Sequence, residues 1–185
     1  MNDAEVLGHV ERYLGGRRHA RPAVAADGRE LGFAVALHRR TSPPMATAVT
    51  DGMRSRTTQS PLPLELACSV RPGQEEQAAR LVEMFAEATV RGDAEVEYDD
   101  GFLVEEPLIP GTAVRGLLAA PHPYADEMFN LFRDAEGELA LQFVTLVPIT
   151  GPEGHYLRDH ETGELFERWE SAGTDLLDVH RTSAV

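Results

Sequence analysis

The segment Glu138–Ile149 is apolar on both faces of a strand, and this pattern constrains the fold more than any other in the chain. In an extended backbone Leu141 and Phe143 would point to one side of a sheet, while Val144 and Leu146 would point to the other. A strand that is apolar on both sides is typical of the interior of a sheet, where both faces are covered. We therefore predict that this segment is a central strand.

The segments around this strand predict a mixture of helices and strands. Met128–Arg133 is joined to it by Asp-Ala-Glu-Gly, which is typical of an antiparallel hairpin. Gln74–Arg91 carries apolar side chains at helical spacing and stops at Gly92, so we predict a helix that packs on the sheet. Further helices are expected at Ala4–Leu14 and Glu164–Ala172, and further strands at Leu31–His38, Met45–Thr50, Leu64–Val70 and Val114–Ala119.

The remaining segments are interpreted as connections. Residues 17–30 are arginine-rich and expected to be irregular, and the polar residues 53–62 are expected to form a surface loop. The acidic run Asp93–Glu106 predicts a turn with a short strand. Thr150-Gly151-Pro152-Glu153 fits a helix capping box. With 185 residues and no repeat or linker, residues 1–185 are predicted to form one α+β domain, a mixed, mainly antiparallel sheet with flanking helices.

The basic residues exclude several kinds of catalysis. All seventeen are arginine, so the chain contains no lysine. A Walker A phosphate loop, a Schiff base and the attachment of pyridoxal phosphate each require a lysine. These chemistries are therefore excluded from the functions that the chain can have.

The charge of the chain limits its partners. The formal net charge is −14, which repels the phosphates of nucleic acids and acidic membrane surfaces and attracts basic proteins. No segment reaches the roughly 18 apolar residues of a membrane span, and the acidic N-terminus does not resemble a secretion signal. We expect a cytoplasmic protein that binds neither nucleic acid nor membrane.

Residue types that often carry chemistry do not form recognisable motifs here. The closest histidine pair, His155 and His160, is five residues apart, which is a poor spacing for joint metal ligation on a helix. The chain has no Gly-x-Ser-x-Gly elbow. The single cysteine, Cys68, and Trp169 are interpreted as core residues. We predict no catalytic, cofactor-binding or metal-binding residues, and no cofactor.

Several segments together resemble the suppressor of fused family, in the short bacterial form that corresponds to the N-terminal region of the animal protein. The most specific is the stretch 141–150, Leu-Gln-Phe-Val-Thr-Leu-Val-Pro-Ile-Thr, followed by Glu153 and Tyr156-Leu157. A long strand that ends in Pro-Ile-Thr before a short helix resembles a hallmark of the family. Weaker matches lie at 47–53, 61–66, 175–178 and 181–183, so the resemblance is strongest over residues 31–185.

This resemblance implies an α+β fold without known catalytic residues and a protein as the partner. In the animal protein, the corresponding domain takes part in holding a transcription factor through an added β-strand. Similar bacterial domains occur as immunity proteins that neutralise polymorphic toxins. A basic toxin would suit a chain of this negative charge.

Three hypotheses about function remain open. The first is a non-catalytic protein-binding domain of this family, acting as an immunity protein. The second is a small hydrolase or metal-dependent enzyme with a His/Asp/Glu site, and the third is an accessory domain that forms homodimers. The sequence does not determine the oligomeric state. For a partner-binding surface, the loop 121–127 combines an aromatic residue with carboxylates, so we predict contacts at Tyr124, Asp126 and Glu127.

Overall fold

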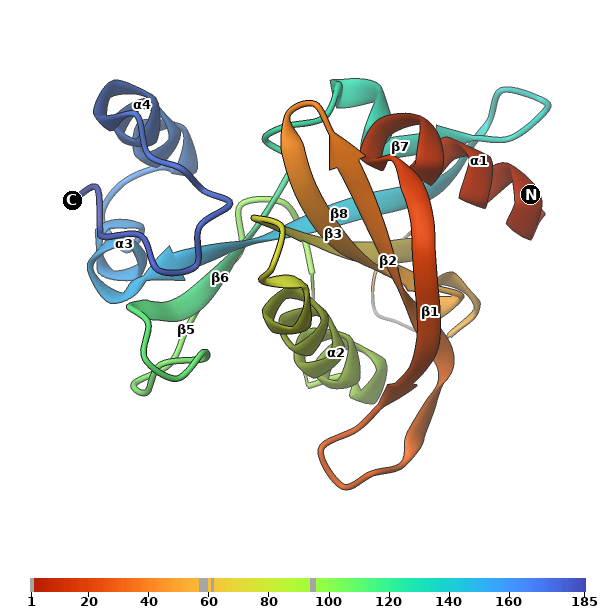
Figure 1. Ribbon diagram of the computed structural model, residues 1–185, viewed down its shortest axis with the longest axis horizontal. Helices are drawn as coiled ribbons and strands as arrows, with labels where there is room; N and C mark the ends of the chain where they lie inside the picture. The colour runs from red at the N-terminus through yellow and green to blue at the C-terminus, as the bar shows by residue number, and fades with distance from the viewer. Residues whose placement is uncertain (1, 57–59, 61, 94–95) are drawn as a thin grey trace.

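The computed structural model describes residues 2–56, 60, 62–93 and 96–185 and is shown in Figure 1. Parts of two sequence predictions, residues 57–59 and 61 of the expected loop and residues 94–95 of the acidic run, lie outside the described residues. The order of elements is α1 (Asp3–Leu14), β1 (Gly16–Val24), β2 (Glu30–Thr41), β3 (Pro44–Asp51), η1 (Met53–Ser55), β4 (Leu64–Val70), α2 (Glu75–Arg91), β5 (Gly101–Leu103), β6 (Val114–Ala120), η2 (Glu127–Phe129), β7 (Leu131–Arg133), β8 (Leu139–Thr150), α3 (Gly151–Tyr156) and α4 (Thr162–Ala172).

The strands form one mixed sheet. Its order is β1-β2-β3-β4-β8-β6-β5, and β7 pairs with β8 beside that path. Only the β4–β8 pair is parallel among the described strands, and the other pairs are antiparallel. The predicted fold class, α+β with a mainly antiparallel sheet and flanking helices, is therefore confirmed.

Strand β8 is the central strand that its sequence predicts. It pairs with β4 along one edge and with β6 and β7 along the other. Leu141 and Phe143 are buried in one apolar cluster, while Val144 and Leu146 are buried in a second cluster on the opposite face. The two-sided apolar pattern thus arises because helices and loops cover both faces of this strand.

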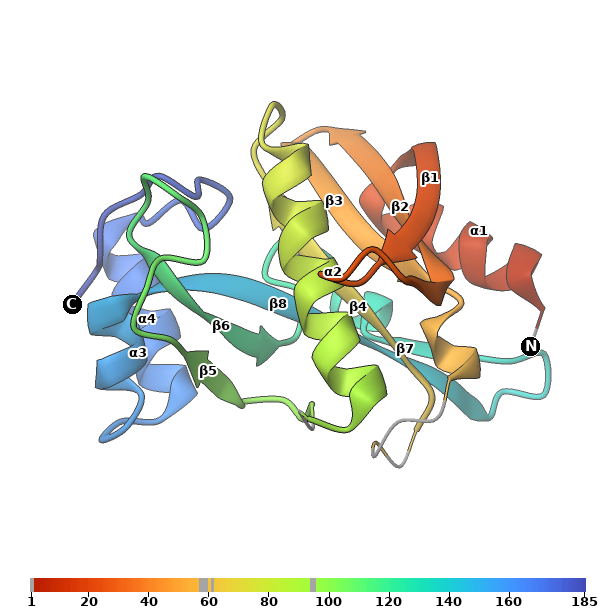
Figure 2. The same cartoon turned by 90° about the horizontal axis from the view of Figure 1, so that it is seen from below.

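Helices cover the two faces at different places. Helix α2 lies across one face over β2, β3 and β4, as Figure 2 shows. Helix α1 covers the opposite face near β1, β2 and β3. At the far end of β8, α3 lies beside β5 and β6, and α4 packs against β6 and β8 (Figure 1). No helix of the described part is both long and apolar enough to cross a membrane.

Two sequence predictions are wrong. Residues 17–30 were expected to be irregular, but most of them form strand β1 and its hairpin turn. Strand β1 ends the sheet and is largely exposed, so it needs no apolar alternation. Its arginines instead make ion pairs, as between Arg17 and Asp51 at 3.1 Å and between Arg21 and Glu83 at 2.8 Å.

The expected surface loop 53–62 begins with a buried turn. Met53 is fully buried in the core, and the side chain of Arg54 is buried beside Glu65 with 2.5 Å between Nη1 and Oε1. Glu65 also accepts hydrogen bonds from Thr50 Oγ1 at 2.5 Å and from the backbone N–H of Gly52 at 2.9 Å. The carboxylate anchors this turn through long-range contacts, which local polarity could not reveal.

Glu153 joins the end of β8 to the C-terminal segment. It completes the predicted capping box, because Glu153 N–H donates to Thr150 Oγ1 and Thr150 N–H donates to the Glu153 carboxylate. The fully buried carboxylate also accepts from Arg181 at 2.6 and 2.8 Å and from Trp169 Nε1 at 2.9 Å. Burial works to raise the pKa of Glu153, but the bonds and charge of Arg181 outweigh burial and hold the pKa below its usual value.

We predict that Glu153→Ala destabilises the fold by about 3–5 kcal/mol, because it leaves the Arg181 guanidinium buried without its counter-charge. The free energy of unfolding in urea measures this effect. Glu170→Ala, on the exposed side of α4, is the matched control and should change stability by less than about 0.5 kcal/mol. Equal losses in the two variants would contradict the role assigned to Glu153.

Candidate interaction site

The loop predicted to bind a partner is only partly at the surface. Asp126 and Glu127 are exposed, and Asp126 Oδ1 accepts from Met128 N–H at the start of η2. Tyr124 is half-buried, and its hydroxyl accepts a hydrogen bond from Leu176 N–H at 3.1 Å. The structure therefore leaves the two carboxylates available to a partner but gives the tyrosine ring a role in holding the C-terminal segment.

His122 in the same loop is buried and meets a serine that the sequence does not place near it. Its Nε2 lies 2.7 Å from Ser69 Oγ, which in turn lies 2.8 Å from Thr47 Oγ1. A serine beside a histidine is the arrangement that activates a nucleophile, so the protonation of the ring decides what this pair can do.

The ring of His122 is in the wrong form to activate Ser69. Its Nδ1 accepts from Tyr124 N–H at 3.1 Å, so the proton of the neutral ring sits on Nε2 and is donated to Ser69 Oγ. Burial, with a smaller contribution from the charge of Arg40, lowers the pKa of His122 to about 3. Ser69 and His122 are also only 6% and 4% exposed, so the geometry favours a structural hydrogen-bond network.

The other chemistry-bearing residues are dispersed. In the described ranges, no three His, Cys, Asp or Glu side chains come together in a way that could hold a metal ion. His160 stacks on Tyr156 with 3.8 Å between ring centroids and bonds to Glu164, and His155 does not join it. Cys68 is fully buried, as expected, and burial raises the pKa of its thiol to about 12.

Strand β5 forms an open edge of the sheet. Ala119 N–H donates to Asp100 C=O and Val104 N–H donates to Arg115 C=O, both at 2.8 Å, so residues 100 and 104 face β6. In an antiparallel ladder alternate residues face opposite ways, and Gly101 and Leu103 therefore direct their N–H and C=O groups away from β6. Since β5 ends the strand order in the described part of the chain, these groups lie where another strand could pair.

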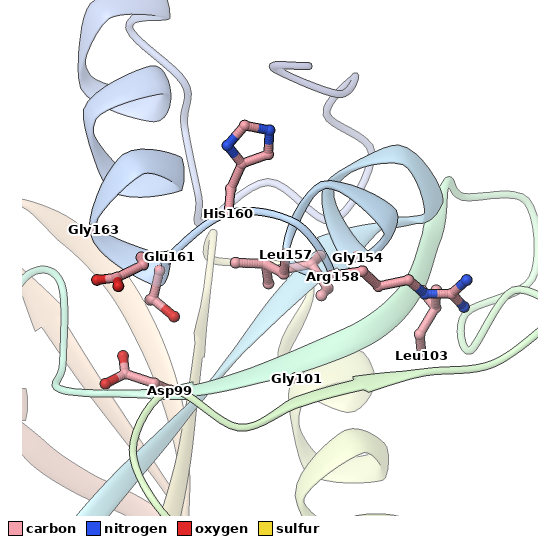
Figure 3. A pocket seen from close by; sticks show the side chains of 11 residues that line it. Asp99, Gly101, Leu103, Gly154, Leu157, Arg158, His160, Glu161 and Gly163 are labelled. Carbon is pink, nitrogen blue, oxygen red and sulfur yellow. The ribbon is translucent and has the colours of Figure 1, made fainter.

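A pocket of about 660 Å³ lies along this edge, between β5, α3 and the start of α4 (Figure 3). Its wall includes Gly101 and Leu103, whose backbone groups face outward, and the apolar side chain of Leu157. Gly154 lets α3 approach β5 closely, because a Cβ at this position would lie 2.5 Å from Leu103 Cδ1. The close packing of α3 thus sets the position of the pocket beside the edge.

The charge around the pocket is mainly negative. Asp99 and Glu161 face one another across it, while the side chains of Arg158 and His160 point away from them in Figure 3. Further exposed carboxylates lie on either side of β5, at Glu97, Glu105 and Glu106. Asp99 has a φ of 74°, a backbone conformation that L residues rarely adopt. The site offers two carboxylates, an apolar wall and free backbone groups.

The fold and this edge define an α+β domain with one mixed sheet and an unpaired edge strand, β5, in the described part of the chain. The sequence profile described as Suppressor of fused protein (SUFU) matches residues 30–182. The chain belongs to the suppressor of fused family, as the motifs of its central strand indicated. A search of curated protein sequences returns no match.

Solved structures share the fold. A suppressor of fused homologue from Neisseria gonorrhoeae superposes with a TM-score of 0.68 at 22% identity, covering 99% of this chain and 96% of that one. A structure of the Sufu–Fu complex gives 0.68 at 12% identity, with 97% and 89% coverage. Drosophila Suppressor of Fused gives 0.58 at 12% identity, and the match covers 82% of this chain but only 42% of the Drosophila chain.

Sequence reasoning missed the β5 site. The acidic run was correctly expected to contain a short strand, but no binding role was predicted for its carboxylates. Asp99 and Glu161 are far apart in the chain, and they line one pocket only because α3 and the start of α4 pack beside β5. The available signal was the short apolar stretch 101–104 between acidic segments, which is typical of an exposed, charged edge.

We predict that His122 makes the fold less stable as the pH falls below about 6.5. Its pKa is depressed in the folded state, so its contribution is present above the unfolded pKa and is lost as the unfolded chain takes up a proton. The expected loss is about 2 kcal/mol between pH 6.5 and pH 5. His9 and His38, whose pKa values burial also lowers, add a loss of the same sign.

Urea unfolding at several pH values should show a smaller loss for His122→Gln than for the unchanged chain. An NMR titration provides a direct second reading, in which the ring of His122 stays neutral down to pH 5. A ring that becomes protonated near pH 6.5 in the folded protein would contradict this interpretation.

Proposed function

We propose that this domain is a non-catalytic protein-binding module that accepts an extended segment of its partner at the edge of β5. The observation that carries the proposal is the coincidence of outward-facing backbone groups at Gly101 and Leu103 with a pocket beside them. In this binding mode, hydrogen bonds to the added strand provide affinity, and pockets for its side chains provide specificity.

The side chains of the pocket favour a basic partner. An arginine or lysine entering it would lay its aliphatic part on Leu157 and bring its charge to Asp99 and Glu161. The formal net charge of −14 would speed the encounter with such a protein. Asp126 and Glu127, which are exposed at the start of η2, are proposed as a further contact with the same partner.

The biological role that we propose for this binding is that of an immunity protein. The domain would neutralise a basic toxin, such as a nuclease, by forming a complex with it. The Sufu–Fu structure supports protein binding in the family, because it is a complex of a suppressor of fused protein with another protein. The specific support from this chain is its acidic edge and its overall charge.

The test uses the proteins encoded by the genes next to this one, each purified and titrated against the chain by calorimetry. We expect one of them to bind, and the double variant Asp99→Asn/Glu161→Gln to weaken that binding at least tenfold, with less dependence on salt. Glu167→Gln/Glu170→Gln, which removes the same charge from the exposed face of α4, is the matched control.

Two results would contradict the proposal. The first is that none of the neighbouring proteins binds, and the second is that both double variants weaken binding equally, which would indicate general charge attraction. For the immunity role, the toxicity of the bound protein in a growth assay should disappear when the chain is co-expressed. If the bound protein proved not to be toxic, the proposal of a protein-binding module would stand and the immunity role would be contradicted.

A further inference from the structure

Strand β7 forms a second open edge, at the other end of β8 from β5 (Figures 1 and 2). Phe143 N–H donates to Asn130 C=O at 2.8 Å, while Gln142 N–H donates in the opposite direction, to Pro63 C=O at 3.0 Å. Leu131, the partner of Gln142, is therefore in a non-hydrogen-bonded pair, and its own N–H and C=O groups face away from β8. This edge can accept a strand in the same way as β5.

A groove of about 440 Å³ lies beside this edge, between β7 and α1. One wall is the face of α1 formed by Glu5, Gly8, His9 and Arg12. The other wall is the end of β7 and the turn that follows it. Its floor contains Phe132, which the ring of His9 meets edge-on at 5.4 Å. The residues that line it include Glu5, Gly8, Arg12, Phe132, Arg133 and Asp134.

Gly8 widens the groove and has no role in the packing of the chain itself. A Cβ at this position would meet no atom within 4 Å, so no contact of the fold requires a glycine. Glycine inside a helix costs about 0.5–1 kcal/mol relative to alanine. Its effect is to leave the middle of the α1 wall without a side chain, as an incoming backbone would need.

The chain that leads into β7 carries exposed apolar and acidic side chains. Met128 and Leu131 are 55% and 37% exposed, and because side chains alternate along a strand, Leu131 lies on the opposite face of β7 from Phe132. Asp126 and Glu127 precede them. The segment 126–138 contains Asp126, Glu127, Asp134, Glu136 and Glu138 but only one basic residue, Arg133, and α1 adds Glu5 and Arg12 to the groove, so six carboxylates stand against two arginines. This excess of carboxylates favours a basic occupant.

We infer that the β7–α1 groove is a second strand-accepting site, which binds an extended segment of another protein with basic and apolar side chains. Backbone groups of the segment pair with Leu131 and Arg133. Its alternate side chains enter the groove beside Phe132 and cover Leu131 on the opposite face of β7, and its basic side chains meet the carboxylates of the groove and of the turn after β7. The site is separate from the β5 edge and does not depend on it. One partner chain, or two, can then be held at opposite ends of β8.

The test is a selection from a display library of random 12-residue peptides on the whole chain, followed by affinity measurement of the enriched peptides. Peptides that bind the groove should carry a net positive charge and should lose at least tenfold in affinity for Gly8→Trp, which fills the groove. Gly8→Ala should give an intermediate loss and an equal or higher melting temperature, which separates blocking from unfolding.

Two controls assign the site. Asp99→Asn/Glu161→Gln, at the β5 pocket, should leave the affinity of these peptides unchanged. The β7–α1 site and the β5 site are thus tested independently of one another. The NMR signals of the Leu131 and Arg133 amides should shift and become protected from exchange when a peptide is added. Enriched peptides that are acidic, or that bind Gly8→Trp as well as the unchanged chain, would overturn the inference. Self-association that Gly8→Trp abolishes would instead assign the groove to a second copy.

Discussion

The double-sided burial of β8 is the constraint on which the rest of the structure depends. Its residues contribute to all three apolar clusters, through Val144 on the α2 face, Phe143 on the α1 face and Ile149 beside α4. Strands pair with β8 along both edges, and helices and loops pack on both of its faces. The positions of β5 and β7, which form the proposed sites, are therefore fixed relative to β8. Even Glu153, which holds the C-terminal segment, follows directly after its last residue.

A sheet built around such a strand still has edge strands. These edge strands differ from one another in side-chain charge and in whether their outward backbone groups are protected from pairing. Strand β1 ends one side with ion-paired arginines and with Pro22, features that protect an edge from further pairing. Strand β5 ends the other side with three residues, outward-facing backbone groups and surrounding carboxylates. The two proposed sites therefore lie at β5 and β7, where backbone groups face away from the sheet.

The sequence determined the parts of the fold that have strong local signals. The apolar pattern of β8, the helical spacing of α2 and the capping box at Thr150 were each confirmed within about two residues. Strand β1 was missed because an exposed edge strand has no apolar alternation. Neither the Ser69–His122 contact nor the shared pocket of Asp99 and Glu161 could be predicted, since each depends on segments brought together only by strand order and helix packing.

The most direct test of the account is residue-resolved amide hydrogen exchange of the chain, alone and bound to its protein partner. In the free protein, the amides of Gly101 and Leu103 should exchange quickly while that of Phe102, which faces β6, is protected. In the complex, all three should be protected, because the added strand pairs with the outward-facing groups. A stable complex in which Gly101 and Leu103 still exchange quickly would contradict binding by strand addition at β5.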